Sequence, residues 1–208
     1  GADLRFGTAA TSLDREGCVT SKGDHLEGDV YVAAIPSTEL SQLAGQPWAQ
    51  SRLEYAPIVG INLWYDRPVF EGEVVAAIVE HETFWLFDRT RILGQSGSEH
   101  HIAVSISAAE AVIDTPRAEL ADVVAAKLAK VLKPARLLRS SVEKVRSATF
   151  VPGPGTRRAR LPSRTEIPNL FLAGSWTQSD WPDTMEAAIR SGHAAARLAQ
   201  DFVQEQLH

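Results

Sequence analysis

Short apolar segments separated by turn residues open the chain. Their length and their content of β-branched residues predict strands, and the Asp, Glu and Gly residues between them predict turns. The third segment is almost wholly apolar, which is typical of a strand covered on both faces. Pro36 ends this segment, and Ser37 is a candidate N-cap for a helix that follows it. The predicted strands are residues 4–13, 18–21 and 29–35.

The middle of the chain predicts a sheet with one packed helix. Apolar residues alternate with polar ones in several short segments, and Glu80-His81-Glu82 is expected to form a hairpin turn between two of them. Asp114 followed by Pro116 signals a helix start, because Asp caps helices and proline is favoured at the first helical position. The apolar face of this helix would carry Leu120, Val123, Val124, Leu128, Val131 and Leu132. The predicted strands are residues 58–65, 74–79, 83–87, 101–107 and 137–150.

A short apolar strand, a glycine, a loop and a long helix close the chain. The strand is predicted at residues 169–174, and the helix is expected to begin near residues 181–184. Glycine lets a backbone approach a ligand closely, and a helix N-terminus offers unpaired N–H groups with partial positive charge. The pair suits an anionic or electron-rich group such as phosphate or a flavin carbonyl, although many α/β proteins carry this unit without a ligand. The apolar stripe of the helix would be Met185, Ala188, Ile189, Gly192, Ala195, Ala196, Ala199, Phe202 and Val203.

Composition narrows the class of protein. The 208 residues are 44% hydrophobic and 23% charged, which is typical of a globular protein with a buried core. A net charge of -5 argues against nucleic acid as a partner. A single cysteine, Cys18, excludes an intrachain disulfide and a cysteine-rich zinc site, and it fits a reducing compartment. No apolar run approaches the roughly 20 residues of a membrane span, so we expect a cytoplasmic protein. Peripheral contact with a membrane stays open as an alternative.

Other candidate sites have simpler interpretations. His100 and His101 would face opposite ways on a strand, so they predict no metal site. The basic stretch at residues 156–160 is predicted to be a solvated loop. Three aromatic side chains in the middle of the chain could line an apolar substrate channel, and they could equally belong to the core. They are Trp64, Trp85 and Phe87.

The residues around the last glycine resemble a known motif. The strand Leu170-Phe171-Leu172-Ala173-Gly174, followed by a loop and a Met-Glu-rich helix start, is similar to the C-terminal FAD-binding motif of the flavin amine-oxidase and carotenoid-desaturase superfamily. The string Trp181-Pro182-Asp183-Thr184-Met185-Glu186 resembles that of squalene-associated desaturases, which include phytoene desaturase-like proteins and hydroxysqualene dehydroxylases. Residues 26–36, 57–69 and 84–89 are also similar to segments of these enzymes, so the resemblance spans nearly the whole chain.

This resemblance implies an α/β (mixed α+β) fold in two parts. Residues 1–38 and 151–208 would form an incomplete FAD-binding domain, and residues 39–150 would form a substrate-binding domain with a mixed sheet and flanking helices. The resemblance places Gly174 and Ser175 against the ribityl–pyrophosphate part of FAD, and the helix start at the pyrimidine end of the ring. It singles out no catalytic residue and no metal ligand. The implied FAD-binding residues are Gly174, Ser175, Trp176, Trp181, Pro182, Thr184, Met185, Glu186 and Ala188.

Three departures from the family pattern limit these expectations. Ser175 stands where an acidic residue is usual, and Ala187 stands where glycine is common. No Gly-x-Gly-x-x-Gly occurs in the 208 residues, although the family uses this motif to cradle the FAD pyrophosphate. We therefore expect a missing N-terminal Rossmann half in the full-length protein. Without it, this fragment should bind FAD poorly and be inactive by itself.

The implied activity is FAD-dependent hydride transfer to or from a hydrophobic isoprenoid, such as a phytoene- or squalene-like substrate. One alternative is a flavin amine oxidase, which a lysine near the flavin would favour. The lysines are Lys22, Lys127, Lys130, Lys133 and Lys144, and none lies in the motif. Another alternative is a non-catalytic binding module that has lost FAD, which the substitutions at Ser175 and Ala187 would fit.

Overall fold

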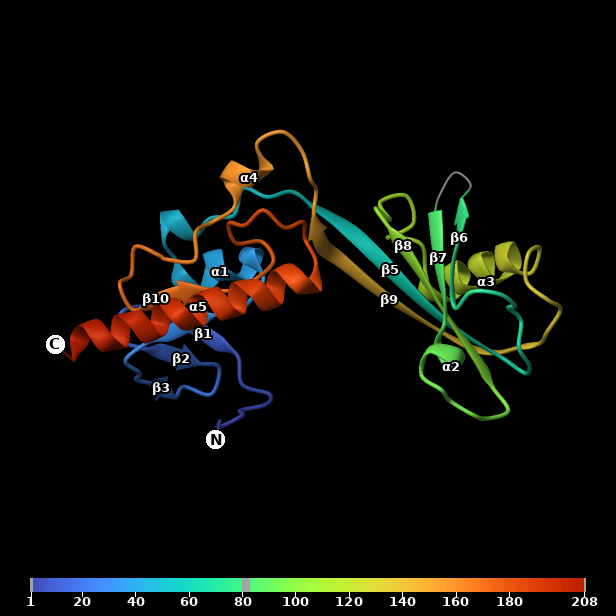
Figure 1. The fold of residues 1–208 in the computed structure, drawn as a ribbon, viewed down its shortest axis with the longest axis horizontal. Helices are drawn as coiled ribbons and strands as arrows, with labels where there is room; N and C mark the ends of the chain where they lie inside the picture. Colours follow the sequence, from blue (N-terminus) through green and yellow to red (C-terminus); the bar gives the residue numbers. More distant parts are fainter. Residues whose placement is uncertain (1, 80–82, 208) are drawn as a thin grey trace. The chain divides into compact units, whose positions relative to one another are not determined.

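The computed structural model describes residues 2–79 and 83–207, so the predicted hairpin turn at Glu80-His81-Glu82 lies outside the described residues. The chain divides into two compact units, which Figure 1 draws with their elements labelled. The first unit comprises Gly1–Glu54 and Phe150–His208, and the second comprises Tyr55–Thr149. Residues 39–54 thus belong to the unit that also holds both ends of the chain.

Two small sheets and a long helix build the first unit. One sheet is antiparallel in the order β1 (Ala10–Leu13), β2 (Cys18–Thr20) and β3 (His25–Leu26). The other pairs β4 (Tyr31–Ala33) with β10 (Leu170–Leu172) in parallel. Parallel neighbours need a long connection, and here that connection contains the whole second unit. The helical elements are α1 (Ser37–Ala44), η1 (Pro47–Ala49), α4 (Thr156–Ala159) and α5 (Met185–Gln206).

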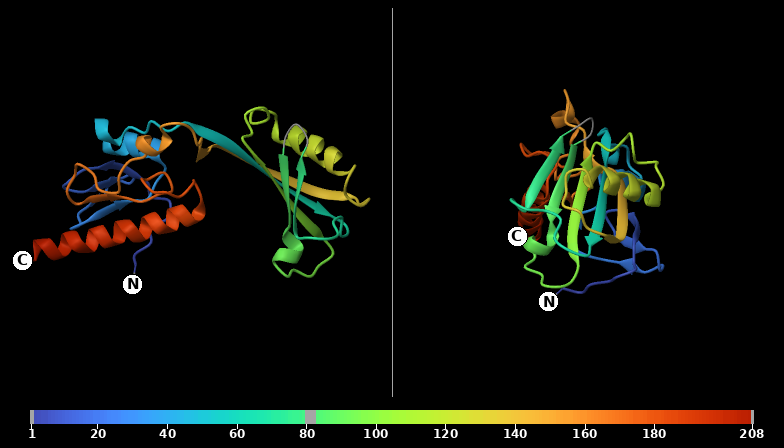
Figure 2. Two further views of the ribbon diagram at one scale, coloured as in Figure 1. Left: turned by 45° about the horizontal axis from the view of Figure 1, so that its top comes forward. Right: turned by 90° about the vertical axis from the view of Figure 1, so that its right-hand side faces the viewer.

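Helix α5 packs against the two-stranded parallel sheet. Phe171 and Ala173 lie against Ala195 in a buried cluster, and Phe202 meets Phe171 edge to face with ring centroids 6.3 Å apart. Figure 2 shows α5 running beside β10 in this unit. The packed face of α5 therefore follows Ala187, Ser191 and Ala195. The predicted stripe was wrong at its N-terminal end, because Met185, Ala188, Ile189 and Ala196 are exposed.

Several expectations for the first unit need correction. The predicted strand at residues 4–13 forms only from Ala10 onward, and β3 occupies a segment where a turn was predicted. Val32 is 47% exposed, so β4 is not covered on both faces within the described residues. Ser37 is the first residue of α1 rather than its N-cap, since Pro36 holds that position and Ser37 is buried against Ser51.

A five-stranded sheet with one helix forms the second unit. Its order is β6 (Val75–Val79), β7 (Thr83–Asp88), β8 (His100–Ser107), β5 (Tyr55–Tyr65) and β9 (Leu137–Phe150). The pairs β6–β7, β7–β8 and β8–β5 are antiparallel. Strand β7 leads into the short helix α2 (Arg89–Ile92), and helix α3 (Arg117–Leu128) lies against one face of the sheet. The buried core joins Val59, Ile61, Leu63, Phe84, Leu86, Ile102, Val104 and Ile106 to Leu120, Val124 and Leu128.

The start and the face of α3 differ from the sequence prediction. Pro116 is the N-cap and Arg117 is the first helical residue, while Asp114 instead accepts a hydrogen bond from Arg146 at 2.6 Å. Val123 is exposed, and Val131 lies beyond the end of the helix and is exposed as well. The buried face of α3 therefore consists of Leu120, Ala121, Val124 and Leu128, and it includes Ala121 instead of the predicted Val123.

Candidate functional site

Gly174 lies two residues after the end of β10, where the chain turns into the loop before α5. Its backbone N–H donates to the Ser191 hydroxyl at 2.7 Å, and its φ of 153° favours glycine. A Cβ at this position would lie 2.4 Å from the indole nitrogen of Trp176. Glycine is therefore required here by the packing of Trp176, independently of any ligand.

Trp176 is an internal anchor of this loop. Its side chain is 5% exposed, and its indole N–H donates to the Ile35 carbonyl at 3.0 Å. Thr177 adds a second contact, because its backbone N–H and its hydroxyl both donate to the Gly174 carbonyl. The structure thus gives Trp176 a packing role, and its predicted place beside the flavin ring stays a prediction.

The start of α5 is capped on one side and open on the other. Thr184 is the N-cap, and its hydroxyl accepts a hydrogen bond from the Ala187 N–H at 3.2 Å. Asp183 immediately precedes this cap, and its carboxylate accepts a hydrogen bond from the Phe150 N–H at 2.7 Å. The N–H groups of Met185 and Glu186 lie in the first turn, where no helical acceptor exists. They remain the donors that a ligand at this helix start could use.

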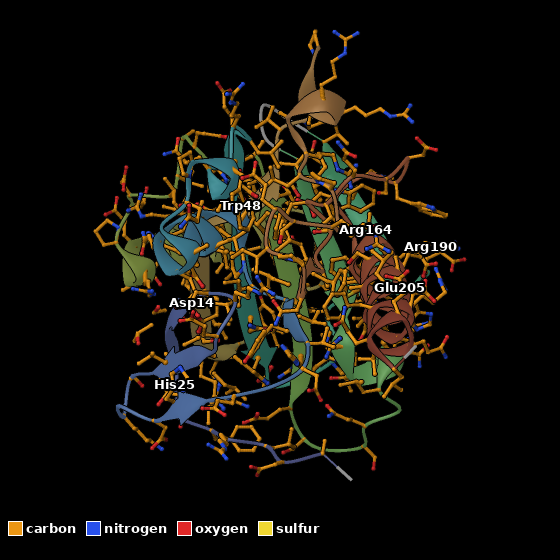
Figure 3. All side chains as sticks on the ribbon, turned by 90° about the vertical axis from the view of Figure 1, so that its left-hand side faces the viewer. Asp14, His25, Trp48, Arg164, Arg190 and Glu205 are labelled. Carbon is orange, nitrogen blue, oxygen red and sulfur yellow. The ribbon has the colours of Figure 1, made fainter. Side chains whose placement is uncertain are left out.

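The surface around this helix start is apolar and accessible. Met185 is 86% exposed, Ile189 is 57% exposed and Trp181 is 42% exposed. Arg190, which Figure 3 labels on α5, lies over the Trp181 ring with 4.4 Å between its guanidinium carbon and the ring centroid. Glu186 pairs with Arg190 at 2.6 Å, so its carboxylate already has a partner on the helix.

The predicted site residues therefore fall into two groups. Trp181, Pro182, Thr184, Met185, Glu186 and Ala188 are exposed around the start of α5, while Gly174 and Ser175 are half-buried in the turn and Trp176 is buried. Ala187 is 2% exposed, so the methyl group that departs from the family pattern packs within the first unit. The Ala187 methyl group therefore does not cover the exposed surface at the start of α5.

Arg160 belongs to this site, although the sequence indicated a solvated loop there. The residue is buried, and its guanidinium donates to the carbonyls of Ser175, Ser179 and Trp181. Burial lowers the pKa of this guanidinium from its ordinary value, and the nearby carboxylate of Asp183 opposes that shift. No spacing rule signals such a residue, because its acceptors are carbonyls of an irregular loop.

The donor set fits a flavin at the helix start. Two unengaged amides at a helix N-terminus suit the pyrimidine end of the ring, where negative charge builds on reduction. Neighbouring Trp181 and Met185 offer apolar surface to a flat ring. Ser175 lacks the charge that the family usually places in the turn, but its carbonyl is held at 2.5 Å by Arg160.

In the second unit, the three aromatic residues that the sequence left open share the sheet face opposite the core. Trp85 is 45% exposed, Phe87 and Trp64 are half-buried, and none of them joins the core cluster. The alternation along β7 explains this, because Phe84 and Leu86 point to the core and their neighbours point away. Trp85 and Phe87 are thus available to a ligand of this unit.

A polar stack lies on the same face of the sheet. His101 stacks on Trp64 with ring centroids 4.4 Å apart, and its Nε2 lies 2.8 Å from the Asn62 side-chain oxygen. Arg139 covers Trp64 at 3.7 Å. Burial lowers the pKa of His101, and the charges of Arg89 and Arg139 lower it further.

His100 points the other way, as the strand alternation predicted. It is buried and its Nε2 lies 3.2 Å from a carboxylate oxygen of Asp88, although the two are not aligned for a hydrogen bond. Within residues 2–79 and 83–207, no cluster of three or more His, Cys, Asp or Glu side chains could hold a metal ion. No helix in the same ranges is long and apolar enough to cross a membrane.

Comparison with known proteins identifies the family of the chain that carries this strand–glycine–loop–helix unit. The chain belongs to the family described as flavin containing amine oxidoreductase, which matches residues 1–199. This match covers both units and includes the whole candidate site.

Within this class, the chain is similar to enzymes named for isoprenoid substrates. It is 29% identical to a hydroxysqualene dehydroxylase of Rhodopseudomonas palustris over 95% of this chain and 47% of that protein. It is 25% identical to a 15-cis-phytoene desaturase of an Oncidium hybrid cultivar over 88% of this chain and 35% of that protein. The chain thus spans less than half the length of these curated relatives.

A solved structure shows the same fold. A protein assigned as a protoporphyrinogen oxidase in Exiguobacterium sp. 255-15 superposes with a TM-score of 0.74 at 12% sequence identity, over 97% of this chain and 48% of that one. The flavoprotein resemblance and the α/β fold class predicted from the sequence are therefore confirmed.

Proposed function

We propose that the full-length protein binds FAD and oxidises or reduces a hydrophobic isoprenoid of the phytoene or squalene type. The observation that carries this proposal is the start of α5, where the amides of Met185 and Glu186 lie in the first helical turn beside the exposed side chains of Met185 and Trp181. When bound, the flavin supplies the redox chemistry, and the protein supplies binding, orientation and electrostatics.

Each element of the site has a defined task in this proposal. The Met185 and Glu186 amides bind the pyrimidine end of the flavin and stabilise the negative charge of its reduced form. The Gly174–Ser175 turn lies along the ribityl–pyrophosphate part, and Trp181 and Pro182 exclude water beside the ring. A dinucleotide-binding segment N-terminal to this chain completes the cofactor site, because the 208 residues contain no Gly-x-Gly-x-x-Gly.

The second unit contributes the substrate surface. Val75, Trp85 and Phe87 present apolar side chains on the sheet face away from the core, where the register places Val75 opposite Phe87. An apolar face of this kind suits a hydrocarbon chain, since burial of such a ligand is driven by the hydrophobic effect. The relatives named for squalene- and phytoene-type substrates support the same substrate class.

The test is spectroscopic. Purified full-length protein is scanned for the visible absorption bands of bound flavin, and it is then incubated without oxygen with isoprenoid hydrocarbons and, separately, with primary amines. Flavin bands that bleach with an isoprenoid support the proposal. Bleaching with amines alone would identify an amine oxidase, and a colourless protein that ignores added FAD would identify a non-catalytic binding module.

A further inference from the structure

The two terminal nitrogens of the buried Arg160 guanidinium make four hydrogen bonds, while its Nε has no partner within the described residues. Its Nη1 donates to the carbonyls of Ser179 at 3.0 Å and Trp181 at 2.8 Å, and its Nη2 donates to the Ser175 carbonyl at 2.5 Å and the Ser179 hydroxyl at 2.8 Å. The residue is 5% exposed and its guanidinium lies 5.1 Å from the ring centroid of Phe150. All four hydrogen bonds go to the single loop between β10 and α5.

Trp176, Thr177 and the Gln178 N–H, which donates to the Leu161 carbonyl at 2.8 Å, hold the first part of this loop, and Arg160 adds contacts along its length. The loop carbonyls point inward to Arg160 at three separate positions, so the guanidinium contacts the beginning, the middle and the end of the loop together. The last residue that Arg160 contacts, Trp181, comes three positions before the N-cap Thr184. Arg160 therefore helps to hold Trp181 in the segment that leads into α5, where Asp183 and Thr184 make further hydrogen bonds.

Other arginines near this loop do not share these contacts. Arg157 forms an exposed ion pair with Asp180, and exposed pairs contribute little to stability. Arg158 and Arg164 are exposed, and Figure 3 labels Arg164. Burying a charge is costly unless several partners compensate for it, so the burial of Arg160 indicates a specific role.

We propose that Arg160 is a positioning residue for the flavin: it holds the loop so that Trp181 and the first amides of α5 meet the ring in one orientation. This inference rests on the proposed flavin site. It extends that proposal by naming a buried residue that sets the geometry of the site without contacting the flavin. Lysine cannot replace the guanidinium here, because a single ammonium group lacks the planar fork that reaches separated carbonyls.

The test uses the full-length protein and the variants Arg160→Lys and Arg160→Met. We measure the flavin dissociation constant, the midpoint potential and the thermal midpoint of each. Both variants should bind oxidised flavin about tenfold more weakly, because hydrogen bonds from a charged group are lost. They should weaken binding of the reduced form by about a further tenfold, which corresponds to a potential about 30 mV more negative.

Arg158→Met is the matched control, because it removes an exposed guanidinium two residues away. It should leave both the affinity and the potential within about twofold of the parent protein, as is usual for surface changes. If the Arg160 variants do not fold, Ser179→Ala decides the question. It removes a hydroxyl that accepts from both the Arg160 guanidinium and the Trp181 N–H, and it should shift the potential in the same direction by a smaller amount.

The outcomes separate this inference from the proposed function. A parent protein that binds no flavin overturns both. A parent protein that binds flavin, together with Arg160→Lys or Ser179→Ala variants whose potential is unchanged, overturns only the role of Arg160. A lowered thermal midpoint with an unchanged potential also overturns that role, because it would show that Arg160 stabilises the fold without positioning the flavin.

Discussion

The Gly174 amide and the Ser191 hydroxyl join the turn after β10 to the second turn of α5 through a 2.7 Å hydrogen bond. Ser191 also donates to the Ala188 carbonyl at 2.6 Å, so its hydroxyl is oriented with its lone pairs toward Gly174. The turn that carries the candidate flavin contacts is thereby attached to the helix that supplies the amide donors.

Replacing Ser191 by alanine should weaken this attachment. The Gly174 N–H would lose its acceptor in a poorly exposed position, which costs about 1–2 kcal/mol in the free energy of unfolding. Urea denaturation of the variant measures the loss. The exposed Ser147→Ala is the control and should change stability by less than about 0.5 kcal/mol. Equal stability of the two variants would show that the bond does not hold the turn.

Alanine at Gly174 should destabilise the protein more strongly than alanine at Gly192. At Gly174 the new Cβ would meet the Trp176 indole, and the backbone φ of 153° disfavours a side chain. At Gly192 the new Cβ would enter open space inside α5, where Gly→Ala stabilises a helix by about 0.5–1 kcal/mol. Thermal unfolding should therefore give shifts of opposite sign. Two shifts of the same sign would contradict the packing at Trp176.

The cap of α5 is open to a direct test. Thr184→Ala removes the acceptor of the Ala187 N–H and should cost about 1 kcal/mol of stability. Thr184→Ser keeps a hydroxyl and should retain most of that stability. Denaturant titration distinguishes the two. A serine variant as unstable as the alanine variant would mean that the methyl group of Thr184, and not its hydroxyl, supports the helix start.

The stack of His101 on Trp64 predicts a pH dependence of stability. Burial and the charges of Arg89 and Arg139 depress the pKa of His101 in the folded protein, so the folded state favours the neutral ring. The resulting stabilisation is complete above the unfolded pKa of about 6.5 and is lost as the pH falls through the lower folded value. Thermal midpoints measured across this range should decline toward acid.

The variant His101→Gln should flatten that decline. His193, which is exposed on α5, provides the matched control, and His193→Gln should leave the decline in place. A slope that survives in His101→Gln would assign the acid sensitivity to other groups.

The sequence predicted the elements that depend on local patterns. Strand β9 was predicted at residues 137–150 and occurs there, because the segment carries β-branched residues and lies between the stop at Pro134 and the turn residues after Phe150. The start of α5 was found near Thr184, since a capping residue followed by a Met-Glu-rich turn is a local signal. The family motif lies between β9 and the first turn of α5, and its residues were also recognisable in the sequence.

Other features depend on contacts distant in sequence. The parallel pairing of Tyr31 with Leu170 joins segments on either side of the second unit, and no periodicity reports it. Alternation shows that Trp85 and Phe87 share a face, but it cannot say which face α3 covers. Arg160 lies in a basic segment that suggests solvent, and only the folded loop reveals its acceptors.

The central claim is that the first amides of α5 bind the flavin ring. The most direct measurement is a crystal structure of the full-length protein with flavin bound. We expect the Met185 or Glu186 nitrogen to lie about 2.7–3.2 Å from an oxygen or nitrogen at the pyrimidine end of the ring. A flavin bound elsewhere, with these amides facing water or capped by protein groups, would contradict it.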